Sequence, residues 1–330
     1  MHLKIGTRTS KLALAQTEEV ISEIKKIQPD FSYEIVKINT KGDQIHHKPL
    51  RDIFEGGKNA FTSELQKALI ENKIDIAIHS MKDVAGNVKE QNLCFPAYLK
   101  RASAVDVIIS RNFIDDIKFL PKDFIIGSVS LRRKLAIKKI NPLVKVRNLR
   151  GSVQTRIAKL RHNFKWEGHP PIFYDAIIMA KAAIERSGED LDLSGLYVKE
   201  ISVQDMIPAA CQGIIGVECR KNDKNIILLL KKISHQETEI CANIEREILY
   251  KLQGNCHTAV GVYCYKESEK HIVICEIASE SGKEIIKISI SEENISANNY
   301  KELVALACNK IRSEAKKFDN DYQRIFNIGF

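Results

Sequence analysis

The chain has 330 residues and a formal net charge of +9, and 44% of its residues are hydrophobic but only 7% aromatic. This length exceeds one typical hydrophobic core, so we expect two or three domains. No apolar run approaches the roughly 20 residues of a membrane span, and the first residues lack the apolar core of a signal peptide. These features predict a soluble, cytoplasmic protein with no membrane partner, and the positive charge favours anionic partners.

The first hundred residues alternate between strand and helix patterns. Strand patterns occupy 4–6, 33–38 and 74–79, and helix patterns occupy 10–27 and 62–71, the first ending before Pro29. This β-α-β-α-β order predicts a largely parallel sheet.

The alternation starts again near residue 105 and changes character after residue 220. Strand patterns at 105–110, 124–127, 144–146 and 175–180, with helices after Ser130 and Ser152, predict a second α/β domain. Helices near 223–234 and 237–252, strands near 259–265, 270–277 and 284–290, and a helix near 298–317 predict a small α+β third domain.

The strand pattern at 75–83 ends in polar groups. Its apolar residues at 76–78 show no polar alternation, which indicates a strand covered on both faces. Ligands of open α/β sheets bind beyond the carboxyl ends of such strands, which is where Lys82 and Asp83 fall. A solvated turn with an incidental Lys–Asp pair explains this segment equally well.

Basic residues fall at three strand-to-helix junctions. Arg8 lies at the first, Arg132 and Arg133 begin a helix at the second, and Arg150 and Arg156 flank the third. Helix N-termini attract anions, and guanidinium groups bind carboxylates as well as phosphates. We therefore predict an anion-binding cleft, although a surface salt bridge would explain each arginine taken alone.

The eight cysteines form no Cys-x-x-Cys pair, so the sequence predicts neither disulfides nor a metal site. Most are expected to be small buried residues. Cys256 is the exception, because the loop Gln253-Gly254-Asn255-Cys256-His257 favours an accessible thiol.

In chain order, these segments resemble the hydroxymethylbilane synthase, or porphobilinogen deaminase, family. The matching motifs are Thr7-Arg8, Ser10, His79 to Asp83, Ser130 to Arg133, Arg150-Gly151, Thr155-Arg156, Gln212-Gly213, Gly216 to Arg220 and the Cys256 loop. The sequence departs from the family pattern at Ala85, where Pro is common, at Val129, where Ser is usual, and at Cys211, where Gly is usual. Asn255 replaces a glycine before Cys256, and Asn59 and Ala60 alter the loop after Lys58.

The resemblance implies two hinged α/β domains resembling periplasmic-binding-protein lobes plus a small α+β C-terminal domain. The division would be 1–99 with 201–221, 100–200, and 222–330. It implies a monomeric transferase that joins porphobilinogen units head to tail, releases ammonia and yields hydroxymethylbilane. It also implies a dipyrromethane cofactor held by a thioether to Cys256.

By the same resemblance, Asp83 is the catalytic carboxylate, facing the pyrrole nitrogens where positive charge develops. The residues expected to hold the cofactor are Cys256, Lys82, Asp83, Ser128, Ser130, Arg132, Arg133, Arg150, Gly151, Arg156, Gln212 and Gly213. Those expected to bind substrate are Arg8, Ser10, Lys58, Arg150, Arg156 and Arg186. Arg101 is a weaker candidate near the hinge.

Two other classes of function compete with this interpretation. A two-lobed protein that closes on a carboxylate or phosphate without catalysis would explain the arginines but not Cys256. A nucleic-acid binder would typically carry exposed aromatic residues among its basic ones, which the low aromatic content does not favour. We therefore expect no nucleic-acid partner.

Overall fold

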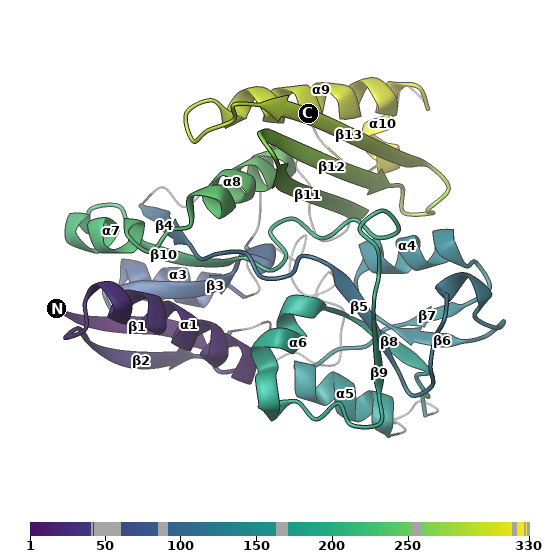
Figure 1. Cartoon of the computed structure of the whole chain (residues 1–330), viewed down its shortest axis with the longest axis horizontal. Coiled ribbons are helices and arrows are strands. Elements are labelled where there is room, and N and C mark those ends of the chain that lie inside the picture. The colour runs from purple at the N-terminus through teal and green to yellow at the C-terminus, as the bar shows by residue number, and fades with distance from the viewer. Residues whose placement is uncertain are drawn as a thin grey trace.

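Three β-sheets organise the protein in the computed structural model, which describes residues 1–40, 42, 61–84, 92–162, 171–252, 259–318, 322–326 and 328. Figure 1 shows two α/β lobes next to each other, with the third sheet and its helices above them.

The first lobe is a five-stranded sheet in the order β2-β1-β3-β10-β4. Its strands are β1 (His2–Arg8), β2 (Ser32–Ile38), β3 (Ile76–Ser80), β4 (Leu93–Tyr98) and β10 (Ile215–Arg220), and its helices are α1 (Lys11–Ile27), α3 (Ser63–Ile70) and α7 (Lys224–Lys231). Strand β1 is parallel to β2 and β3, whereas β10 is antiparallel to β3 and β4.

The second lobe repeats this arrangement in the order β7-β6-β8-β5-β9. Its strands are β5 (Asp106–Ser110), β6 (Ile125–Gly127), β7 (Lys145–Arg147), β8 (Ala176–Ala180) and β9 (Tyr197–Glu200), and its helices are α4 (Leu131–Ile140), α5 (Val153–Arg161) and α6 (Lys181–Ser187). Here β6 is parallel to β7 and β8, and β5 is antiparallel to β8 and β9. Each sheet is therefore mixed rather than largely parallel.

Two segments, 99–105 and 201–214, carry the chain between the lobes and explain the antiparallel strands. Each crossing delivers the strand that follows it, β5 or β10, into the middle of the next sheet. The crossings touch where the Ala102 N–H donates to the Gly213 carbonyl at 3.2 Å. Gly213 has φ +87°, and a Cβ there would lie 2.6 Å from the Ala102 carbonyl oxygen, so this contact requires glycine.

The third domain packs helices on one face of an antiparallel sheet in the order β11-β12-β13. Its elements are α8 (Gln236–Lys251), β11 (Ala259–Glu267), β12 (Lys270–Ala278), β13 (Ile285–Glu293), α9 (Tyr300–Lys316) and α10 (Tyr322–Phe326). Alternate residues of β12, such as Val273 and Cys275, point into one apolar cluster with Ile244 of α8 and Val304 of α9.

The strands and helices predicted from sequence periodicity are present, within a few residues of their expected ends. The pattern missed β4, which contains Pro96 and lies at a sheet edge, and β9, whose four residues are all exposed. It also missed β10, α6 and α10. Helix α7 buries Leu229 and Leu230 in the apolar cluster of the first lobe, although the sequence grouped this segment with the third domain.

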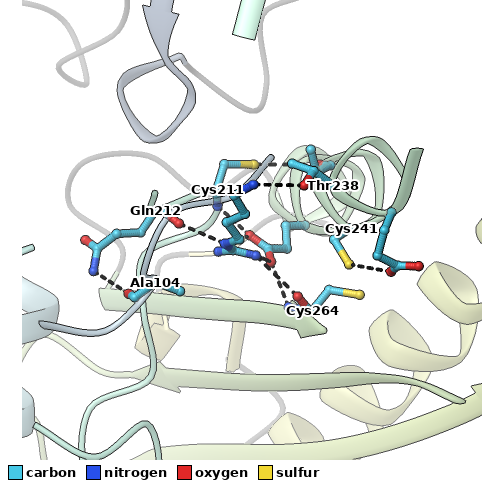
Figure 2. Close-up of polar contacts among 10 residues, drawn as sticks. Ala104, Cys211, Gln212, Thr238, Cys241 and Cys264 are labelled. Atoms are coloured by element: carbon cyan, nitrogen blue, oxygen red, sulfur yellow. Dashed lines mark hydrogen bonds and ion pairs between the residues drawn. The ribbon is translucent and has the colours of Figure 1, made fainter. Parts of the chain in front are cut away.

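A buried ion pair joins both crossings to the third domain. The Arg101 guanidinium donates to the Glu245 carboxylate at 2.6 and 3.3 Å, to the Gln212 carbonyl at 2.9 Å and to the Cys264 carbonyl at 3.2 Å. The same carboxylate accepts from the backbone N–H groups of Cys264, at 2.7 Å, and Cys211. Figure 2 shows these contacts converging from the second crossing, α8 and β11. The Arg101 guanidinium is therefore bound by groups of the protein itself.

We predict that Glu245→Gln lowers the free energy of unfolding by about 3–5 kcal/mol, because it leaves the Arg101 charge buried without its counter-ion. Urea denaturation followed by circular dichroism measures this change. The matched control is Glu269→Gln, whose side chain is 83% exposed and should change the stability by less than about 0.5 kcal/mol. A Glu245→Gln protein as stable as this control would contradict the prediction.

Candidate active site

The Lys-Asp pair lies at the carboxyl end of β3, a strand flanked by β1 and β10 and buried over residues 76–79. A 3₁₀ turn, Met81–Asp83, follows it directly. Met81 is 1% exposed, and its N–H donates to the Ile214 carbonyl at 3.0 Å, which fixes the turn against the second crossing. Lys82 and Asp83 consequently reach the gap between the lobes from a rigid base.

Asp83 forms an ion pair with Arg8 at the end of the neighbouring strand β1. The Arg8 Nη1 lies 3.5 Å from the Asp83 Oδ2, and the Arg8 guanidinium lies 4.3 Å from the centre of the Phe61 ring. The Asp83 side chain remains 32% exposed. This carboxylate is therefore positioned by a cation and still open to a ligand.

Cations of the second lobe face Lys82 closely enough to change its protonation. Lys82 is exposed, yet it is crowded by protein atoms, and this desolvation lowers its pKa to about 8. Arg133 and Arg156 add to the shift, and Asp83 opposes it. Desolvation, Arg133 and Arg150 lower the pKa of Arg156 to about 10. The site thus concentrates positive charge from both lobes.

A cavity between the lobes lies beside this cluster. It is lined by Gln16, Ser80 and Lys82 of the first lobe, by Arg186 of the second, and by Cys211 and Gly213 of the crossing. Gln16 and Ser80 exchange hydrogen bonds at 2.8 and 3.0 Å. The sequence had not singled out Gln16, because one glutamine on an amphipathic helix carries no distinguishing pattern.

Arg186 connects the lobes across this cavity. Its Nε donates to Glu19 of α1 at 2.9 Å, and its Nη2 donates to the Gly213 carbonyl at 3.0 Å. The Arg186 side chain is only 6% exposed. The structure therefore gives Arg186 partners inside the protein at the edge of the predicted substrate site.

Arg132 and Arg133 share one buried carboxylate, Asp106, that sequence reasoning had not included in the site. Each guanidinium lies 2.7 Å from an Asp106 oxygen, and Gln212 donates to the same carboxylate at 2.9 Å. Burial opposes ionisation of Asp106, but the two arginines hold its pKa far below its usual range. The Arg133 Nε, which is buried, has no hydrogen-bond partner among the described residues.

The predicted serines lie at the starts of helices or in the turn before one. The Ser10 and Ser130 hydroxyls accept from the N–H groups of Ala13 and Arg133 and so cap α1 and α4. Ser128 accepts from the Ser130 N–H at 3.3 Å. In each case the oxygen accepts from the backbone, which leaves the hydroxyl proton able to donate to a carboxylate.

Two backbone positions explain residue choices around the site. Gly151 has φ +121° and its carbonyl accepts from the Arg156 Nε at 2.8 Å, which holds that side chain against the third junction. Cys211 has φ +59°, in the left-handed region where glycine is easiest, so the family's usual glycine there has a conformational reason.

Several predicted residues lie outside the described part of the chain. They are Lys58, Cys256 and the departures at Asn59, Ala60, Ala85 and Asn255. Among the described residues, no helix is long and apolar enough to cross a membrane.

The family model described as "Porphobilinogen deaminase, dipyromethane cofactor binding domain" matches residues 3–228. The porphobilinogen deaminase of Alkaliphilus metalliredigens is 38% identical over 285 residues, which are 86% of this chain and 85% of that protein. The one from Natranaerobius thermophilus is 36% identical over 328 residues, covering 96% of this chain and all of that protein. The chain belongs to the porphobilinogen deaminase family.

Among solved structures, the second substrate-binding domain of a putative amino acid ABC transporter from Streptococcus pneumoniae matches 74% of this chain and 96% of its own. The TM-score is 0.41 and the identity is 15%. The two lobes are defined instead by the strand orders of the two five-stranded sheets.

The cleft fits the dipyrromethane that the matched family domain binds. Two linked porphobilinogen units carry four carboxylates, since each unit has an acetate and a propionate. After desolvation, Arg133 and Arg156 lower the pKa of Lys82, and Arg133 and Arg150 lower that of Arg156, as expected for a site with more positive charge than its own carboxylates balance. A polyanion relieves that repulsion.

We predict that the Lys82 ammonium titrates near pH 8 in cofactor-free Cys256→Ala protein and at higher pH in the loaded protein. The sign follows because desolvation by the surrounding protein disfavours the charged form, whereas a bound carboxylate favours it. NMR of ¹³C-methylated lysines measures both values, with Lys82→Arg assigning the signal. A Lys82 signal that titrates with exposed lysines in the cofactor-free protein would argue against a desolvated site.

Proposed function

We propose that this protein is a hydroxymethylbilane synthase that joins porphobilinogen units head to tail and releases one ammonia for each unit. The observation that carries this proposal is a carboxylate, Asp83, at the end of a buried strand and surrounded by cations from both lobes. Family membership supplies the substrate and the linear tetrapyrrole product. We also propose that it acts as a monomer in the cytoplasm, without nucleic acid, which rests on the family alone.

The dipyrromethane, which we propose is held through a thioether to Cys256, supplies the pyrrole to which substrate is added. Cys256 follows α8 in the sequence and lies outside the described residues. The cations of the cleft would bind acetate and propionate side chains. Lys82 and Arg8 do so from the first lobe, and Arg133, Arg150 and Arg156 from the second.

Asp83 would act on the substrate pyrrole. Loss of ammonia from porphobilinogen leaves an electron-poor ring, and a carboxylate fixed near its nitrogen stabilises the charge and accepts the N–H. Arg8, 3.5 Å away, limits the orientations open to the carboxylate. The substrate carboxylates meanwhile orient the reacting carbon, because both lobes hold them at once.

Arg132 and Gln212 would act through Asp106 rather than on the reacting atoms. Together they fix the Arg133 guanidinium against β5 and leave its Nε for a ligand carboxylate. A binding protein without catalysis would need the same cations but not a fixed carboxylate among them. The enzyme therefore accounts for more of the site.

Intact-protein mass and ammonia release test the function together. We expect the purified wild type to carry the added mass of two pyrrole units and to release ammonia from porphobilinogen. The Cys256→Ala protein should carry no added mass and release none. An unmodified wild type that binds porphobilinogen without releasing ammonia would overturn the proposal in favour of a binding protein.

We predict that Asp83→Asn keeps the fold and the cofactor mass but lowers turnover on the order of 10²–10⁴-fold, because an amide cannot stabilise the developing charge. The rate of ammonia release measures this. Asp123→Asn is the matched control, since that carboxylate pairs with Lys145 on the surface of the second lobe. Near-normal turnover in Asp83→Asn would remove Asp83 from the mechanism.

A further inference from the structure

A second cluster of reactive side chains lies in the third domain, away from the cleft. Glu237 and Cys241 are one turn apart on α8, and His271 lies near the start of β12. The His271 Nε2 is 2.8 Å from the Glu237 Oε1, and the Cys241 Sγ is 3.4 Å from the same oxygen. One ligand atom from each residue lies within 4.8 Å of the other two.

This cluster is almost closed to solvent. His271 is 2% exposed and Cys241 is 4% exposed, whereas the Glu237 side chain is 34% exposed and forms the open side. The Nδ1 of His271 is buried and has no hydrogen-bond partner among the described residues. The ring nitrogen that faces Glu237 is the other one, Nε2, so Nε2 is the atom that a metal ion in the cluster would bind.

A second thiol extends the cluster on the side of β11. The Cys264 thiol is in hydrogen-bond contact with the Cys241 thiol, and that contact, with burial, raises the Cys264 pKa. Figure 2 shows Cys241 on α8 turned toward a carboxylate, with Cys264 on the strand beside the helix. The position therefore offers sulfur, nitrogen and oxygen donors from three elements.

We propose that Glu237, Cys241 and His271 bind one divalent metal ion of the zinc type. Zinc accepts this combination of thiolate, imidazole and carboxylate at about 2.0–2.3 Å, which places neighbouring ligand atoms about 3.5 Å apart. The two oxygen contacts, 2.8 and 3.4 Å, are somewhat shorter than that value, and all three ligand atoms lie within 4.8 Å of one another. Thiolate and imidazole ligands exclude magnesium and calcium, which prefer oxygen donors.

The charges of the site balance in the bound state. Metal binding displaces one proton from the Cys241 thiol, and the resulting thiolate with the Glu237 carboxylate neutralises a divalent ion. Without the ion, Glu237 and His271 bind each other instead. The metal ion therefore replaces the hydrogen bond between Glu237 and His271, and no redox step is involved.

Metal binding at this position would tie α8 to β12 beside the Arg101–Glu245 ion pair. The Cys264 backbone contacts both members of that pair. The sequence predicted no metal site because it contains no Cys-x-x-Cys motif. Here the ligands are spaced i, i+4 on a helix and come together with a strand 30 residues later, a pattern that only the fold makes visible.

The test uses purified full-length protein, stripped with a chelator under reducing conditions and titrated with Zn²⁺ alone or Co²⁺ alone. We expect one equivalent of bound Zn²⁺ by elemental analysis, a thiolate-to-Co²⁺ charge-transfer band and a higher thermal midpoint. Cys241→Ala and Glu237→Gln should weaken Zn²⁺ binding by at least about tenfold. Because Glu237 is partly exposed, its variant tests the proposal even if Cys241→Ala folds poorly.

The matched control is Cys275→Ala, which removes a buried thiol from the same strand outside the cluster. It should keep the full equivalent of metal. Cys256→Ser should keep it too, which separates this site from the 253–258 loop and makes the result independent of the proposed function. Failure to bind Zn²⁺, a Co²⁺ complex without a thiolate band, or unchanged binding in both cluster variants would overturn the proposal.

Discussion

The buried ion pair between Arg101 and Glu245 is the interaction on which the arrangement of the three sheets depends. It joins the first crossing to α8, and the same carboxylate holds the backbone of the second crossing and of β11. Glu245 is fully buried, so its charge is tolerable only because all of these donors reach it at once. The position of the lobes and the start of the third domain are thereby set at one point.

In the cleft, by contrast, the charges are not balanced. Its cations are gathered beyond what Asp83 and Asp106 neutralise, so Lys82 and Arg156 keep their charges at an energetic cost. Asp106 reduces that cost by binding two arginines in the protein interior. An anionic ligand relieves the remaining repulsion between the cations. The empty site is therefore less stable than the loaded site, and this difference favours the binding of a polycarboxylate.

Helix α8 lies between these two regions and the segment of the sequence that contains Cys256. One face carries Glu245 to the ion pair, and its first turns carry Glu237 and Cys241 to β12. Its C-terminus leads into residues 253–258, where Cys256 lies in the sequence. Whatever fixes α8 against the third sheet therefore also fixes the last described residue before Cys256, Leu252.

The sequence by itself determined the local elements and the residue types at their ends. The apolar strand before Lys82, the capping serines and the arginines after three strands could all be recognised, because these features depend on neighbours a few residues apart. The ordered motifs also indicated the family. Edge strands such as β4, with its proline, lacked a sufficient local signal.

Only the tertiary structure decided which charged groups meet. Arg8 and Asp83 lie 75 residues apart in the sequence, and Arg101 meets Glu245 across 144 residues. Asp106 of β5 meets Arg132 and Arg133 of helix α4. Each side chain alone fits a surface salt bridge equally well. The insertion of β10 and β5 into the sheets after the crossings brings these charged groups together. Burial then makes their pairing obligatory, because an unpaired buried charge would cost about 3–5 kcal/mol.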